Sequence, residues 1–178
     1  MKNVEIERKF LIKKKDIPFD LKNYRYSDIS QSFLYIKPAI RIRKMDKKYY
    51  LTIKTKPPKE IDGKNDLART EYEVEIPKGC YKHLLKLCIG RTIEKTRYYV
   101  PYNRHTIEID VFKGVLKGLI YAEIEFNSVK NALKFIPPVW FFKEVTGIEK
   151  YKNTQLSICK NIKNVLKYYG SIGEWSLL

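Results

Sequence analysis

Cysteine and histidine are scarce in this chain of 178 residues. The three cysteines, Cys80, Cys88 and Cys159, are too few and too scattered for a disulfide framework or a cysteine-based metal cage. Neither His83 nor His105 has a second metal-binding residue at a useful spacing, so we assign no role to them. The sequence also lacks a Gly-Lys-Ser/Thr loop, which excludes an enzyme of the P-loop class.

Long apolar runs are absent as well. A membrane helix needs roughly 18 apolar residues, and the longest candidate segment, residues 136–142, contains two prolines. The N-terminus is charged from Lys2 onward and never supplies the apolar stretch of a signal peptide. We therefore expect a soluble, reduced, cytoplasmic protein that has no membrane partner.

Acidic residues are outnumbered by basic ones, 20 to 36, which gives a net charge of +16. A polyanion is consequently the first partner to consider. Lysine supplies most of the excess, and only eight of the basic residues are arginine. Because a lysine excess also fits a solvated surface, the positions of the charges are more informative than their number.

Most of the chain predicts strands. Its length suits one domain, residues 1–178, and a hydrophobic content of 44% excludes disorder over the whole length. Segments rich in Ile, Val, Tyr, Phe and Thr alternate with a period of two over residues 3–12, 31–45, 48–57, 69–76, 91–101, 104–112 and 119–126. Helical spacing of apolar residues predicts helices over residues 78–89, with Gly90 as the C-cap, over residues 128–135, and over residues 154–169. The order indicates an α+β domain of antiparallel strands with a few helices.

Charged residues occupy every second position of these strands, so they share one face while apolar residues occupy the other. The charged rows are Glu5, Glu7 and Lys9; Arg41 and Arg43; Lys54 and Lys56; Arg69, Glu71, Glu73 and Glu75; Lys95 and Arg97; Glu108 and Asp110; and Glu123 and Glu125. A solvated sheet face would explain a single row. It does not explain why some rows are wholly basic and others wholly acidic, or why four of the eight arginines fall in them.

A closed barrel with the charged face inside would account for this sorting. Closure removes the sheet edges, and helices can cover the apolar outer face. Clustered carboxylates bind hard divalent cations such as Mg²⁺ or Mn²⁺, and clustered arginines and lysines bind phosphate oxygens. Both signs in one lumen predict metal-assisted recognition of a polyphosphate.

Short charged motifs also follow one another along the chain in a fixed order. They are Glu5-x-Glu7-x-Lys9, Arg41-x-Arg43, Thr52-x-Lys54, Arg69-x-Glu71-x-Glu73, Lys95-x-Arg97, Glu108-x-Asp110, Glu123-x-Glu125, Pro138-x-Trp140, Glu144-Val145-Thr146 and Tyr151-x-Asn153. With this series the sequence resembles the triphosphate tunnel metalloenzymes, or CYTH superfamily, and is closest in type to bacterial inorganic tripolyphosphatases. One departure is Phe33, where the family pattern leads us to expect a tyrosine.

The resemblance implies a closed eight-stranded antiparallel β-barrel, a tunnel with a charged lumen and a few helices packed outside. By position, the implied ligands of Mg²⁺ or Mn²⁺ are Glu5, Glu7, Glu123 and Glu125, and Ca²⁺ is expected to inhibit. The implied phosphate-binding residues are Lys9, Arg41, Arg43, Lys54, Lys56, Arg69, Lys95 and Arg97. Glu73 and Asp110 would act near a second metal or the attacking water, and Lys9 would also be catalytic.

Hydrolysis of a small triphosphate, above all inorganic tripolyphosphate, is the favoured function. An adenylate cyclase of the class IV type or a thiamine triphosphatase would use the same scaffold, so both stay open. A non-catalytic binder of polyphosphate or nucleic acid is a weaker alternative, because carboxylates repel a polyanion unless a cation intervenes. We do not expect a nucleic-acid partner, and the sequence leaves a homodimer open.

Overall fold

The computed structural model describes residues 4–57, 61, 66–160 and 165. It contains nine strands: β1 (Val4–Leu11), β2 (Tyr26–Tyr35), β3 (Ala39–Met45), β4 (Lys48–Thr55), β5 (Ala68–Glu75), β6 (Ile89–Tyr102), β7 (His105–Phe112), β8 (Ile120–Glu125) and β9 (Lys143–Glu144). The helices are α1 (Lys78–Leu85), α2 (Val129–Lys134) and α3 (Asn153–Ile158), with short 3-10 turns between elements. Within the described residues, no helix is long and apolar enough to cross a membrane.

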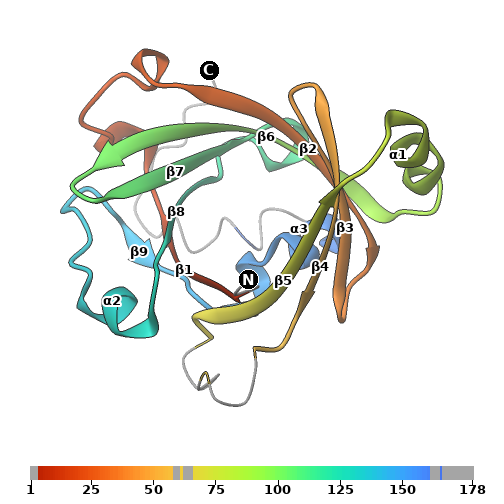
Figure 1. The fold of residues 1–178 in the computed structure, drawn as a ribbon. Helices are drawn as coiled ribbons and strands as arrows, with labels where there is room; N and C mark the ends of the chain where they lie inside the picture. Colours follow the sequence, from red (N-terminus) through yellow and green to blue (C-terminus); the bar gives the residue numbers. More distant parts are fainter. Residues whose placement is uncertain (1–3, 58–60, 62–65, 161–164, 166–178) are drawn as a thin grey trace.

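Eight of the strands close into an antiparallel barrel, as predicted. The strand order is β5-β4-β3-β2-β6-β7-β8-β1, and β1 closes the ring by pairing with β5, Val4 opposite Thr70 and Ile6 opposite Ala68. The two-residue strand β9 adds to β1 opposite Phe10 and Leu11. Figure 1 looks down this ring, with α1 and α2 outside it and α3 within its outline.

The predicted strand over residues 31–45 is wrong, because the structure divides it between β2 and β3. Residues 36–38 form the turn between the two strands. Pro38 has no backbone N–H and cannot continue a strand ladder, which explains why the ladder breaks there. Because the turn divides one predicted strand into two, the barrel has eight strands where the sequence pattern predicted seven.

Two helix predictions also need correction. The helix α1 ends at Leu85, and Gly90 belongs to β6, where its φ of +69° requires glycine. A Cβ at Gly90 would lie 2.6 Å from the Ser157 carbonyl oxygen, so this glycine also allows α3 to approach β6. The helix predicted over residues 154–169 is interrupted after Ile158, since Cys159 has an extended ψ of 128°. Beyond Lys160 the structure describes only Val165 of that range, which is helical, and the rest of the prediction lies outside the described residues.

The strand alternation continues to one end of the barrel, where the inward residues change from charged to apolar. Two positions along β1, β2 and β7 from Lys9, Gln31 and Asp110, the inward residues are Leu11, Phe33 and Phe112, each at most 2% exposed. They form a hydrophobic cluster with Ile93, Tyr121, Tyr151 and, from α3, Leu156. A second cluster on the outer face of β1, β7 and β8 packs beneath α2. The helix α3 therefore packs over the apolar end of the lumen, and the charged section lies further along the strands.

Candidate active site

The lumen encloses two adjoining cavities of about 490 and about 1050 Å³. Six residues line both cavities, namely Glu5, Glu7, Lys9, Arg41, Lys54 and Asn153. The smaller cavity is walled mainly by charged side chains from the strands. The larger one adds the turn before β3 and the segment from Val145 to Thr154. The shared lining makes the two cavities one continuous passage.

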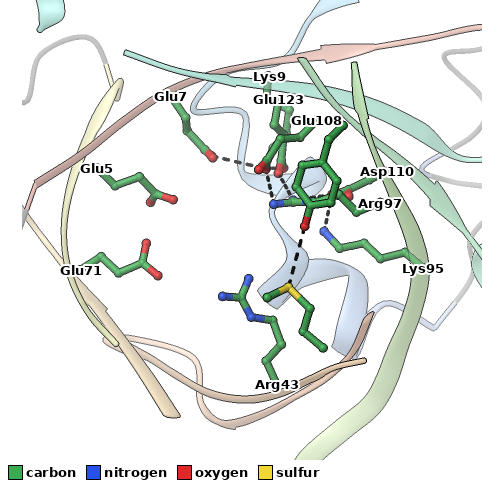
Figure 2. Close-up of polar contacts among 12 residues, drawn as sticks. Glu5, Glu7, Lys9, Arg43, Glu71, Lys95, Arg97, Glu108, Asp110 and Glu123 are labelled. Atoms are coloured by element: carbon green, nitrogen blue, oxygen red, sulfur yellow. Dashed lines mark hydrogen bonds and ion pairs between the residues drawn. The ribbon is translucent and has the colours of Figure 1, made fainter. Parts of the chain in front are cut away.

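A dense ion-pair network lines the wall formed by β1, β6, β7 and β8. Lys9 lies 2.9 Å from Glu123 and 3.5 Å from Glu7. Arg97 bonds Glu123 at 2.6 Å and Asp110 at 2.7 Å, and it also bonds Glu108. Lys95 bonds Asp110 (Figure 2). These bonds join four strands whose charged residues are far apart in the sequence.

The opposite wall, formed by β3, β4 and β5 with the start of β1, carries separate ion pairs. Lys54 lies 2.5 Å from Glu5 and 2.9 Å from Glu71. Arg43 bonds both carboxylate oxygens of Glu73 at 2.8 Å, and the Thr52 hydroxyl donates to the same carboxylate at 2.7 Å. In Figure 2, Glu5 and Glu71 face one another, while the Arg43 guanidinium points into the open centre.

The carboxylates divide into compensated and uncompensated groups. Burial raises the pKa of Glu123, but Lys9, Lys95 and Arg97 outweigh it and hold that pKa well below its usual range. Burial, with the nearby charges of Glu108, Glu5 and Glu7, raises the pKa of Glu125 to about 7. Burial also raises the pKa values of Glu7 and Glu108, each of which has Glu123 as a repelling neighbour. Burial is the first cause for all three, and around Glu125 the neighbouring carboxylates also outweigh the one neighbouring cation, Lys54.

The pKa values of the basic side chains in the lumen depend on burial and on the carboxylates that they contact. Burial lowers the pKa of Lys9, yet Glu123 and Glu7 more than offset this and raise it above its usual value. The pKa of Arg97 is raised as well, by Asp110 above all, against the effect of burial. For Lys95 burial prevails, and its pKa is lowered although Asp110 opposes the change. Lys9 is therefore a cation at neutral pH rather than a proton acceptor.

The residues present suit a hard divalent cation by their chemistry. Carboxylate oxygens are the ligands that such cations prefer, and the repulsion that helps to raise the pKa of Glu125 would be relieved by a bound cation. Within the part of the chain that the structure describes, no three acidic, histidine or cysteine residues are grouped closely enough to hold a metal ion. The ion pairs give the reason, since Glu5 and Glu123 turn toward Lys54, Lys9 and Arg97.

Every residue proposed for the site from the sequence lines one or both cavities, with the exception of Asp110. Asp110 is fully buried behind Lys95 and Arg97, which donate hydrogen bonds to both of its carboxylate oxygens. Lys56 and Arg69 line only the larger cavity, where Lys56 is exposed and Arg69 bonds Asp66 at 3.0 Å. Glu75 lies outside both cavities and pairs with Lys48.

Several lining residues were missed by the sequence analysis. They are Gln31, Met45 and Tyr99 in the smaller cavity and Asn153 in both. Met45 and Tyr99 each lie two positions beyond a predicted arginine, so extending the charged rows by one step would have found them. Gln31 lies two positions before Phe33 on the inward face of β2. Asn153 comes from α3, and no strand pattern could place it in the lumen.

The larger cavity combines basic and apolar side chains. Phe33, Ile36, Leu67, Ile148 and Tyr151 are among its apolar lining residues, and Lys56 and Arg69 are among its basic ones. Apolar surface of this kind, which the sequence did not locate, can hold an organic group. At the position where we expected a tyrosine, Phe33 contributes part of this surface.

Comparisons with known proteins agree with this architecture. Residues 3–132 match the CYTH domain. An inorganic triphosphatase of Nitrosomonas europaea is 35% identical over 86% of this chain and 97% of its own length. An inorganic triphosphatase of Acetivibrio thermocellus is 34% identical over 93% of this chain and 97% of its own length. The crystal structure of the inorganic triphosphatase NE1496 superposes with a TM-score of 0.62 at 32% identity, covering 88% of this chain and 96% of that one.

Proposed function

The chain belongs to the CYTH domain family, and from that premise we propose that it hydrolyses a phosphoanhydride bond of a small triphosphate. Inorganic tripolyphosphate is the favoured substrate. The observation that carries the proposal is the closed lumen, in which arginines and lysines from several strands face carboxylates whose negative charge is only partly compensated. The names of the two curated relatives support the same substrate.

The basic side chains would bind the substrate. Arg41 and Arg43 project from one strand and can each present paired N–H donors to phosphate oxygens. Lys54 on one wall and Lys9 and Arg97 on the other lie along the same passage. Because Lys9 remains protonated, we assign it charge stabilisation of the phosphate group rather than proton abstraction.

The carboxylates would serve two purposes. Glu5, Glu7, Glu123 and Glu125 would hold Mg²⁺ or Mn²⁺, which when bound would neutralise charge on the phosphate oxygens. Glu73 reaches the smaller cavity from a position fixed by Arg43 and Thr52, which suits it to orient a water molecule. Asp110 is too deeply buried for direct contact, so its effect on the reaction would be to hold Lys95 and Arg97 in place.

One observation favours a second candidate. The apolar lining of the larger cavity would accommodate an organic group attached to the triphosphate, as in thiamine triphosphate or a nucleotide. A nucleotide would also permit cyclisation, with the ribose hydroxyl in place of water.

A substrate panel tests these alternatives. The protein would be incubated with tripolyphosphate, pyrophosphate, thiamine triphosphate or ATP, each with Mg²⁺, Mn²⁺, Ca²⁺ or EDTA, while phosphate and cyclic AMP are measured. We expect phosphate release from tripolyphosphate with Mg²⁺ or Mn²⁺, none in EDTA, and inhibition by Ca²⁺. Cyclic AMP from ATP would replace the proposal with a cyclase, and tight binding without turnover of any substrate would replace it with a binder.

A further inference from the structure

Gln31 on β2 is a buried amide whose nitrogen has no hydrogen-bond acceptor among the residues that the structure describes. Its side chain is 1% exposed and lines the smaller cavity. Buried polar groups in proteins nearly always have a partner, and one that lacks it destabilises the fold. The orphaned Nε2 is therefore available to a ligand that brings an acceptor into the smaller cavity.

The neighbours of Gln31 identify the chemistry of that acceptor. Gln31 lies directly opposite Arg43 in the β2–β3 ladder, and the Nε atoms of Arg43 and Arg41 are also buried and have no acceptor within the described part of the chain. The carboxylates on this side, Glu71 and Glu73, already accept from one terminal nitrogen, Nη2, of Arg41 and of Arg43 respectively. Three donor nitrogens without acceptors, two of them in guanidinium groups, suit an anion with several oxygens, such as a phosphate group.

The cavity that Gln31 lines indicates which phosphate group of the substrate it would contact. Gln31 and Arg43 line the smaller cavity and not the larger one, whereas Lys56 and Arg69 line only the larger one. We infer that the Gln31 amide is a substrate-binding residue, which donates a hydrogen bond to the phosphate group held in the smaller cavity. The inference rests on the proposed function and assigns to that site a residue outside the charged motifs.

A neutral donor contributes in a different way from an arginine. The Gln31 amide adds no charge, so it fixes the position of the phosphate through the direction of one hydrogen bond. Attraction by Arg41 and Arg43 weakens as salt screens it, but the contribution of Gln31 should not depend on salt. A buried amide whose acceptor comes from a ligand should also lower the stability of the ligand-free protein, because its donor is then unpaired.

The test replaces Gln31 with methionine, which is similar in length and has no N–H group. Gln155→Met is the matched control, since this second glutamine lies on α3 outside both cavities, near Glu149. Melting temperature would be measured without ligand. Tripolyphosphate affinity would be measured by calorimetry at several salt concentrations, in EDTA and again in Ca²⁺.

For Gln31→Met we expect an unchanged or higher melting temperature and an affinity that is about tenfold lower, because a hydrogen bond to a charged group has about that effect or more. For Gln31→Met the slope of affinity against salt concentration should match that of wild type. Gln155→Met should change neither the melting temperature nor the affinity. Gln31→Glu keeps the size of the side chain and adds a negative charge beside the phosphate. It should lose more affinity than Gln31→Met, and it provides the test if the methionine variant fails to fold.

Other outcomes would overturn the inference. Wild-type affinity in Gln31→Met would show that the amide does not touch the substrate, and a lowered melting temperature in the empty protein would show a structural role. Failure of wild type to bind tripolyphosphate in either EDTA or Ca²⁺ would overturn both this inference and the proposed function. Binding that depends on Gln31 without any turnover in Mg²⁺ or Mn²⁺ would overturn the proposed hydrolysis and leave the assignment of Gln31 intact.

Discussion

Arg8 and Lys9 are neighbours on β1, but they face opposite sides of the barrel wall. Arg8 points outward and bonds both carboxylate oxygens of Glu144, at 2.8 and 2.6 Å. Its remaining nitrogen donates to the backbone carbonyl oxygens of Ala132 and Phe135, at 3.0 and 2.8 Å. All three guanidinium nitrogens thus have acceptors within the protein, and the cluster ties β1 to β9 and to the end of α2.

The inner face of the same strand is different. Lys9 divides its attraction between Glu123 and Glu7, and the pKa of Glu7 is still raised, first by burial and then by the neighbouring carboxylates. Across the lumen, the Nε atoms of Arg41 and Arg43 are buried donors that have no acceptor among the described residues. The outer charges are matched to one another, whereas the inner charges leave room for a cation and an anion together. The charged groups on the outer face therefore stabilise the fold, and we assign those on the inner face to binding.

Removal of one inner carboxylate should have the largest effect. Glu7→Gln keeps the size of the side chain and removes a negative ligand from the proposed cation site, and Glu5→Gln should behave in the same way. Stabilisation of phosphate charge by a metal is worth several kcal/mol, so we expect turnover to fall on the order of a thousandfold or more. Phosphate release from tripolyphosphate in Mg²⁺ measures this loss.

The matched control is Glu75→Gln, because Glu75 lies on β5 outside both cavities and should tolerate the change. Without metal, Glu7→Gln should melt at the same temperature as wild type or higher, since it relieves repulsion among the lumen carboxylates. Wild-type turnover in Glu7→Gln would refute its assignment as a metal ligand.

A smaller loss is expected when an inner arginine becomes lysine. Arg43→Lys keeps the positive charge but loses the forked donor geometry, and Arg41→Lys does the same. A charge-assisted hydrogen bond contributes about 1.5–3 kcal/mol, so kcat/KM should fall about ten- to a hundredfold. Arg104→Lys, at an exposed turn between β6 and β7, should leave kcat/KM unchanged. Equal kinetics in all three variants would show that the two inner arginines do not bind the substrate.

The inner rows could be predicted because strand alternation is a local property of the sequence. Once Glu5 points into the lumen, Glu7 and Lys9 must follow it, and the same argument holds for Arg41 with Arg43. A closed barrel followed from the sorting of these rows by charge. Its strand count came from the family resemblance, since the sequence pattern merged β2 with β3.

Contacts across the lumen could not be predicted from alternation. Lys54 meets Glu5 although 49 residues separate them, because barrel closure brings β4 close to β1. Asp110 belongs to an inward row, but the pattern does not show that Lys95 and Arg97 cover it. Side-chain depth depends on the packing of several strands at once, and a single strand pattern does not contain that information.

The smallest effect is expected on the outer face. The pKa of Glu144 is lowered from 4.5, first by its hydrogen bonds from Arg8 and then by Thr146 against a contribution from burial. A carboxyl group with a lower pKa in the folded state adds stability above pH 4.5, and that stability is lost as the pH falls further. Glu144 is 39% exposed on its side chain, so solvent screening limits the contribution to about 1 kcal/mol. Glu144→Gln should therefore melt a few degrees below wild type at pH 7, approach it as the pH falls below 4.5, and retain wild-type turnover at 25 °C. A melting difference that does not shrink with falling pH, or a loss of turnover as large as that of Glu7→Gln, would contradict the contrast between the two faces of β1.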